Sequence, residues 1–244
     1  MPATRSLARR LLGLLDLTSL GEDDTPEKIR ALCTSARTPY GLPAALCVYP
    51  EHVTTVHKAL DGTGIKVATV VNFPDGGADP ARVARETQRA IAAGADEIDM
   101  VLAWQAVNAG DIATARAGVD ACREACGPDV ALKLILETGE LETPERIRQA
   151  SDIGLDAGVD FLKTSTGKVP VNATPEAAAV MLNAIAARGG TCGFKVSGGV
   201  RTLADAQVYL SLAEDRLGAD WITPARFRIG ASSLLGAITA ALEG

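Results

Sequence analysis

The chain has 244 residues, of which 47% are hydrophobic and 22% are charged, and its formal net charge is −6. This composition is typical of a globular protein with a sizeable core, and the acidic balance without a basic stripe argues against a nucleic-acid partner. No apolar run reaches the roughly 20 residues that span a bilayer. The run Leu11–Leu15 is also too short for a signal-peptide core, so we expect a cytoplasmic protein without membrane contact.

The cysteines and histidines do not form a metal-site pattern. The five cysteines are an odd number and widely spread, which indicates reduced thiols in a reducing compartment. Cys122 and Cys126 have helical spacing, but no second pair of ligands accompanies them. His52 and His57 are five residues apart and would point in different directions on a helix. The sequence therefore predicts neither a metal ion nor another cofactor.

Eight short apolar segments have the pattern of parallel strands that are covered on both faces. In chain order they are Leu14–Thr18, Ala45–Tyr49, Lys66–Val71, Glu97–Leu102, Ala131–Glu137, Phe161–Ser165, Gly193–Val196 and Arg228–Gly230. The last of them follows an irregular stretch over residues 220–227.

Helical patterns lie between these strands. Four of them start with a cap residue followed by proline, a combination that favours a helix start: Thr25-Pro26, Asp79-Pro80, Thr143-Pro144 and Thr174-Pro175. Other helices are predicted near Glu51–Leu60, from Asp111 to Cys126, from Thr202 to Leu217 and near Ser232–Leu242. Similar Ala-Gly-Ala/Val-Asp phrases recur at helix ends, where glycine stops the helix.

This strict alternation of strands and helices predicts a parallel sheet. Eight strands within 244 residues favour a closed (β/α)8 TIM barrel over an open sheet. We therefore expect an α/β fold with a single domain over residues 1–244 and an additional helical segment at the N-terminus.

Charged residues occur on several of the predicted strands. The fourth strand carries Asp99, the sixth Lys163 and the seventh Lys195, while Lys133 and Glu137 share one face of the fifth. The interior of such a barrel is normally apolar, and active sites lie at the C-terminal strand ends, so these charges need partners or a purpose. A structural ion pair between Lys133 and Glu137 is expected.

Lys163 lies between Leu162 and Thr164, on a strand of buried-type residues. Burial disfavours its ammonium form, and a second amine nearby, such as Lys195, lowers its pKa further. A neutral amine attacks carbonyl carbons to form a Schiff base. Two other interpretations stay open: a lysine whose head extends to solvent, and a buried ion pair of a lysine with Asp99.

Glycines and hydroxyls follow the seventh and eighth strands, in Ser197–Arg201 and Gly230–Ser233. Loops at these two positions, each followed by a helix, are the usual phosphate site of this barrel. Residues 166–168 (Thr-Gly-Lys) would add a third side, but they are not a Walker A loop because the preceding glycine is missing. Simple turn glycines are the alternative. Together with the lysines, the loops predict imine chemistry on a phosphorylated aldehyde or ketone.

Several of these segments resemble deoxyribose-phosphate aldolase, a class I aldolase of the DeoC type. They are Leu15–Thr18, Glu97–Val101, Lys133–Thr138, Phe161–Gly167, Lys195–Arg201 and Arg228–Ser233. The resemblance covers nearly the whole chain. It implies a lyase that reversibly cleaves 2-deoxy-D-ribose 5-phosphate to D-glyceraldehyde 3-phosphate and acetaldehyde, without a metal.

The resemblance also implies roles for individual residues. Lys163 would form the Schiff base, Asp99 and Lys195 would move protons, and Lys195 would keep Lys163 partly neutral. The substrate-binding residues would be Asp16, Thr18, Lys133, Thr164, Thr166, Gly167, Lys168, Gly198, Gly199, Arg201, Gly230, Ser232 and Ser233. Some members continue into a tail that ends in tyrosine and assists proton transfer; this sequence ends at Gly244, so water is expected to replace it.

The residues alone leave two other classes open. Another Schiff-base aldolase or a transaldolase would keep Lys163 but use a different donor. A catalytically silent phospho-sugar sensor would keep the glycine loops without needing both Lys163 and Lys195. The expected partners are a phosphorylated sugar and aldehydes, and the protein is expected to form a homo-oligomer, either a dimer or a tetramer.

Overall fold

The computed structural model describes residues 2–244 and contains a closed barrel of eight parallel strands. Each strand pairs with the next along the chain, and β8 pairs with β1 to close the barrel. The strands are β1 (Leu15–Ser19), β2 (Ala45–Val48), β3 (Lys66–Val71), β4 (Glu97–Val101), β5 (Ala131–Ile135), β6 (Phe161–Lys163), β7 (Gly193–Ser197) and β8 (Phe227–Ala231). The predicted (β/α)8 barrel is confirmed.

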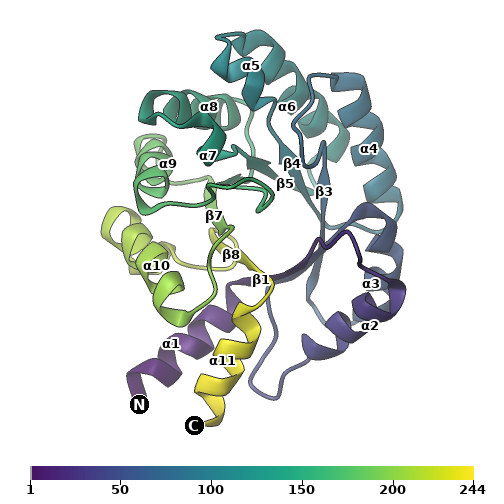
Figure 1. Cartoon of the computed structure of the whole chain (residues 1–244), viewed down its shortest axis with the longest axis vertical. Helices are drawn as coiled ribbons and strands as arrows, with labels where there is room; N and C mark the ends of the chain where they lie inside the picture. Colours follow the sequence, from purple (N-terminus) through teal and green to yellow (C-terminus); the bar gives the residue numbers. More distant parts are fainter. Residues whose placement is uncertain (1) are drawn as a thin grey trace.

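Helices surround the strands on the outside (Figure 1). The longer ones are α2 (Pro26–Ser35), α3 (Val53–Leu60), α4 (Pro80–Ala92), α6 (Ile112–Cys126), α8 (Pro144–Asp156), α9 (Pro175–Ala187), α10 (Leu203–Leu217) and α11 (Leu234–Glu243). The predicted N-terminal segment is α1 (Pro2–Gly13), which packs beside α11, so the two chain ends lie close together (Figure 1). Within the described part of the chain, every helix falls short of the length and apolarity that a membrane span requires.

The four predicted cap-proline starts are helix starts in the structure. The side chain of each cap residue accepts a hydrogen bond from the backbone N–H three residues later, which satisfies one of the free donors of the first turn. Thr202 begins α10 with a reciprocal capping box to Asp205. Local sequence chemistry therefore determines where these five helices begin.

Two predicted strand ends differ from the structure by two residues, others differ by one, and several short elements were not predicted. β5 ends at Ile135 rather than Glu137, because Glu137 adopts a left-handed backbone (φ 58°) and precedes α7 (Thr138–Leu141). β6 ends at Lys163 rather than Ser165. The short helices α5 (Trp104–Asn108) and α7, and the 3-10 turns η1 (Pro50–His52) and η2 (Ala219–Trp221), were not predicted because they are too short to show a helical period.

The strand register brings charged side chains into one half of the barrel. Asp99 pairs in register with Lys133, and Lys163 pairs with Lys195 on the next strand. β2 and β3 instead contribute a small apolar cluster of Ala45, Cys47, Ala68 and Val70. The interior is therefore charged toward β4–β8 and β1, and apolar toward β2–β3.

Candidate active site

Asp99 on β4 is the centre of the charged interior. Its Oδ1 lies 2.7 Å from Lys133 Nζ, and its Oδ2 lies 2.7 Å from both Lys163 Nζ and Lys195 Nζ. Burial favours the neutral acid, but the attraction of the three lysines outweighs it and holds the pKa of Asp99 well below its usual range. Asp99 is therefore a carboxylate that three amines share.

Lys163 differs from its two neighbours. Burial, the largest effect, and the charge of Lys195 lower the pKa of Lys163 despite the attraction of Asp99. For Lys195 and Lys133, burial acts in the same direction, but two carboxylates face each of them and raise their pKa values. Lys163 is therefore the amine of this cluster that most readily becomes neutral.

Arg228 on β8 forms the base of the cluster and was missed by the sequence analysis, as was the contribution of Glu97. The Arg228 guanidinium lies 2.7 Å from Asp16 Oδ1 and 2.9 Å from Glu97 Oε1. Glu97 Oε2 in turn lies 2.6 Å from Lys133 Nζ. Strand alternation was the available signal, because Glu97 lies two residues before Asp99 and so faces the same side of β4.

The predicted ion pair between Lys133 and Glu137 is wrong. Lys133 contacts Glu97 and Asp99, whereas the Glu137 carboxylate accepts hydrogen bonds from the backbone N–H and the hydroxyl of Thr166. The reason is the early end of β5, which turns Glu137 away from the Lys133 side of the strand. Burial raises the pKa of Glu137, against the effect of these hydrogen bonds.

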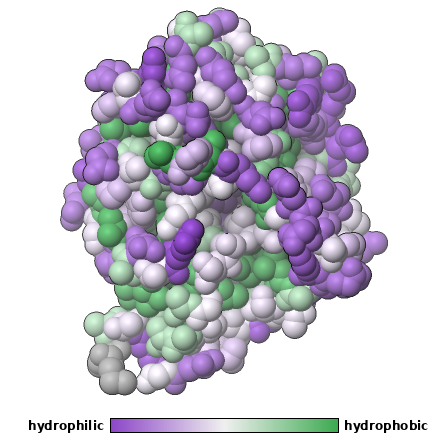
Figure 2. Space-filling view, viewed as in Figure 1, coloured by the Kyte–Doolittle hydropathy of each residue, from purple (hydrophilic) through white to green (hydrophobic). Residues whose placement is uncertain are grey.

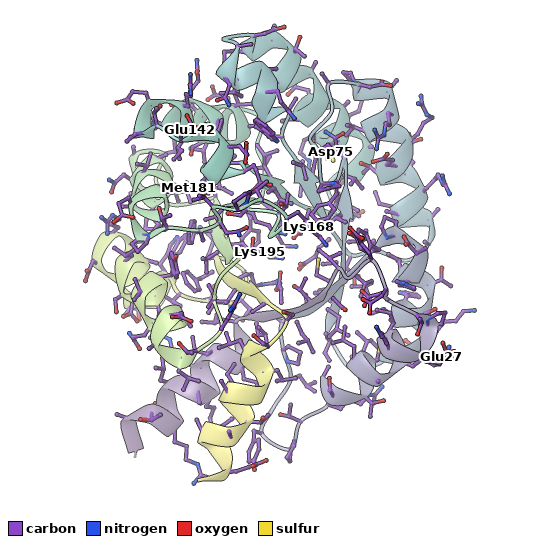
Figure 3. The ribbon with its side chains drawn as sticks, in the orientation of Figure 1. Glu27, Asp75, Glu142, Lys168, Met181 and Lys195 are labelled. Carbon is purple, nitrogen blue, oxygen red and sulfur yellow. The ribbon has the colours of Figure 1, made fainter. Side chains whose placement is uncertain are left out.

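A cavity of about 540 Å³ opens above this cluster, with Lys163 in its wall. Figure 2 shows that the middle of this face is hollowed and carries mostly hydrophilic and intermediate residues. In Figure 3, Lys168 and Lys195 lie near the barrel centre, while Glu27 and Glu142 lie at the periphery. The predicted substrate-binding residues that line the cavity are Thr18, Thr166, Gly167, Lys168, Gly198, Gly199, Arg201, Gly230, Ser232 and Ser233.

Three residues predicted to bind substrate lie behind the cavity wall instead. Asp16 and Lys133 are fully buried in ion pairs, and the Thr164 hydroxyl donates to the carbonyl of Ser197 and accepts from its N–H. Asp99 and Lys195 are also fully buried: Asp99 contacts Lys163, which lines the cavity, and Lys195 contacts Asp99.

Two cavity residues have arrangements that the sequence did not indicate. Lys168 extends across the cavity mouth, where its Nζ donates to the carbonyl of Leu20 (2.6 Å) and lies 6.0 Å from the centre of the Tyr49 ring. Gly230 makes room for the cluster, because a Cβ there would lie 3.0 Å from Lys195 Cε. A larger residue at position 230 would therefore press against the side chains of Lys195 and Ser197.

The loop after β1 forms a wall of the cavity that the sequence analysis did not predict, and it carries two carboxylates. Asp24 accepts hydrogen bonds from the Ser19 hydroxyl and the Gly21 N–H, which fix the loop. The unpredicted lining residues are Ser19, Leu20, Gly21, Asp23, Asp24, Asn172, Ser197, Val200 and Ala231. Ser19, Ser197 and Ala231 are the last residues of β1, β7 and β8, and the others lie in loops, where sequence periodicity gives no signal.

Among residues 2–244, no group of three or more His, Cys, Asp or Glu side chains has the arrangement of a metal site. Cys47 is fully buried next to the lysine cluster, and burial together with the charge of Asp99 raises the pKa of its thiol.

Comparison with known proteins agrees with this geometry. A model of the DeoC/LacD family of aldolases matches residues 11–238. A Toxoplasma gondii protein provisionally identified as a deoxyribose-phosphate aldolase is 28% identical, with a TM-score of 0.90 over 100% of this chain and 98% of that one. A Coccidioides immitis protein with the same provisional identification is 29% identical (TM-score 0.84; 96% and 86% covered). An aldolase named QR15 is 27% identical (TM-score 0.81; 96% of both chains).

Proposed function

Because the chain belongs to the DeoC/LacD family of aldolases, we propose that it is a class I aldolase that reversibly cleaves 2-deoxy-D-ribose 5-phosphate to D-glyceraldehyde 3-phosphate and acetaldehyde. The observation that carries the proposal is Lys163. It is a buried amine with a lowered pKa that opens into a cavity, and its Nζ lies 2.7 Å from a carboxylate. These are the properties of a lysine nucleophile.

In the proposed reaction, Lys163 Nζ attacks C1 of the open-chain aldehyde, and the carbinolamine loses water to give a protonated imine. Asp99 and Lys195 supply and accept the protons of these steps. Asp99 Oδ2 contacts the Lys163 amine, and Lys195 contacts the same oxygen. The iminium withdraws electrons, so the C2–C3 bond breaks as the C3 hydroxyl loses its proton. The resulting enamine is protonated at C2, and hydrolysis of the imine releases acetaldehyde and the free amine.

The phosphate would bind at the opposite wall of the cavity. Gly198 and Gly199 have positive φ values of 84° and 90°, a backbone that exposes N–H groups to an anion. The second loop, with Ser232 and Ser233, leads into α11, whose N-terminus favours negative charge. In this proposal, Lys168 would exchange its contact with the Leu20 carbonyl for one with the phosphate.

Borohydride trapping tests the nucleophile directly. With acetaldehyde present, reduction should leave an ethyl group on Lys163, detected by peptide mass analysis, and Lys163→Met should lose both the adduct and the cleavage of deoxyribose 5-phosphate. Lys168→Met is the matched control, because this second cavity lysine should be dispensable for the adduct and affect mainly the KM of the phosphorylated substrate. An adduct on any other lysine would disprove the assignment.

Donor assays test the substrate class. We expect acetaldehyde to be accepted as the donor, while dihydroxyacetone and pyruvate are not. If dihydroxyacetone or pyruvate were accepted as the donor and acetaldehyde were not, the proposed Schiff-base chemistry would stand but the proposed substrate would be wrong. The expected dimer or tetramer stays a prediction that light scattering of the purified protein would test.

A further inference from the structure

The ionised side chains at the base of the barrel form a closed ring of alternating charge, which we call the charge ring. In order around the ring, it consists of Arg228, Glu97, Lys133, Asp99, Lys195 and Asp16. Each member contacts the next at 2.6 to 2.9 Å, and Asp16 contacts Arg228 to close the ring. Every cation of the ring therefore lies between two carboxylates.

Lys163 lies outside this ring and contacts it at one point, Asp99 Oδ2. The ring contains three cations and three carboxylates, so it is neutral when all six groups are ionised. A protonated Lys163 would add one uncompensated positive charge to a buried site, which is costly. Its loss of a proton leaves every ring contact in place.

The remaining titratable groups that face Lys163 do not supply the missing negative charge. The Cys47 thiol on β2 has a raised pKa and stays neutral at neutral pH. Glu137, which follows β5, is attracted by the charge of Lys163, but burial raises the pKa of Glu137 and weakens its contribution, and its hydrogen bonds are to the N–H and hydroxyl of Thr166. Lys195 on β7 adds positive charge.

We propose that Arg228 and Glu97 are positioning residues for the reaction: by closing the charge ring they keep Lys133 and Lys195 charged, which leaves Lys163 as the amine that gives up its proton. Both residues are buried behind the cavity wall and act through the ring rather than on substrate. The catalytic meaning of this inference rests on the proposed Schiff-base function. The lowered pKa of Lys163 and the raised pKa values of Lys133 and Lys195 agree with it.

Arginine suits this position for two reasons. A guanidinium stays charged in proteins and presents several donors in a fixed plane, so it can contact two carboxylates at once. Arg228 uses this geometry on Asp16 and Glu97, and its guanidinium lies 5.6 Å from the centre of the Phe161 ring, within cation–π range. A neutral residue here would open the ring and remove one of its three positive charges.

The test is a double-mutant cycle of Arg228 and Glu97 in which the pKa of the Lys163 amine is measured directly. Competitive acetylation with acetic anhydride across a pH series, followed by peptide mass analysis, gives the pKa of the Lys163 amine whether or not the protein cleaves deoxyribose 5-phosphate. Arg228→Met removes a positive charge, so it should raise the pKa of Lys163 by about one unit. Glu97→Gln removes a negative charge and should lower it, and the double variant should return it toward the wild-type value.

Arg228→Lys keeps the charge and is the conservative control, so it should leave the pKa of Lys163 close to the wild-type value. Thermal unfolding shows whether each variant is folded; if Arg228→Met is not, Glu97→Gln and Arg228→Lys decide the question. The inference would be overturned if the pKa of Lys163 shifted in the same direction in both single variants, or did not shift in Glu97→Gln. Opposite shifts are expected only from an electrostatic role, since a merely structural role does not depend on the sign of the charge removed. A wild type that gives no borohydride adduct at Lys163 would instead refute the proposed function and leave the acetylation result valid.

Discussion

Replacing Lys195 with methionine removes a charge beside the proposed nucleophile while keeping the length of the side chain. Lys163 and Lys195 each lie 2.7 Å from the same oxygen of Asp99. Their two nitrogens are therefore at most about 5.4 Å apart, and with an effective dielectric constant of about 20 two unit charges at that distance repel by about 3 kcal/mol. This corresponds to a rise of about 2 units in the pKa of Lys163 when the repulsion is lost.

The pH dependence of kcat/KM for cleavage of deoxyribose 5-phosphate measures this effect. In Lys195→Met the acid limb should move to higher pH by about 2 units, so up to about 100-fold of the loss at neutral pH should be recovered by raising the pH. A further loss of about 10²- to 10⁴-fold should persist at every pH, because a proton-transfer group is missing. These two contributions are separable in one pH series.

The control and the refuting result both use the same assay. Lys168→Met removes a cavity cation that lies outside the Asp99 cluster, so it should raise KM without moving the acid limb. Removing one partner of a buried ion pair costs about 3 to 5 kcal/mol, so thermal unfolding must show that Lys195→Met is folded at the assay temperature. A folded Lys195→Met enzyme with the wild-type pH profile would refute the electrostatic role of Lys195.

Four other results are expected. Glu137→Gln removes an acceptor for the hydrogen bonds that hold the cavity loop, so KM for the phosphorylated substrate should rise severalfold while the borohydride adduct still forms. The pKa of Asp99 is lowered in the folded protein, so the contribution of its carboxylate to stability is complete above about pH 4 and is lost as the pH falls. In urea unfolding between pH 3 and 7, the free energy of unfolding should therefore fall more steeply toward low pH in the wild type than in Asp99→Asn. In α8, a Cβ at Gly154 would lie 2.7 Å from Leu162 Cδ2, so Gly154→Ala should lower the free energy of unfolding by about 1 to 3 kcal/mol. Gly236→Ala in α11, where a Cβ meets open space, should raise it by up to about 1 kcal/mol.

The fold was predictable because its signals are local. Short apolar runs indicate buried parallel strands, and cap residues followed by proline mark where helices begin. Neither signal depends on what lies across the barrel. The predicted strand was too long where the apolar pattern continued beyond the end of the strand. The apolar run Leu134–Leu136 extends past the end of β5, and a pattern of alternating residues does not show the left-handed backbone at Glu137.

The site was predictable only in part, because its contacts depend on the register around the barrel. Asp99, Lys163 and Lys195 could be brought together from strand ends alone, since they lie on β4, β6 and β7. The contact between Glu97 and Arg228 joins residues 131 positions apart, and it forms across the interior between strands that are not neighbours. Strand order alone does not say which charges meet in this way, so the closure of the ring is visible only in the three-dimensional structure.

The apolar strands of the barrel, as well as the charged ones, affect the pKa of Lys163. Burial is the largest influence on the pKa of Lys163, ahead of any single charge. The side of the interior that faces the cluster from β2 and β3 consists of Ala45, Cys47, Ala68 and Val70, with no ionised group among them. Such a wall excludes water and lowers the local dielectric constant, which strengthens every ion pair of the ring and increases the cost of an unpaired ammonium. Burial therefore lowers the pKa of Lys163, and the carboxylates that face Lys133 and Lys195 keep the pKa values of these two amines raised.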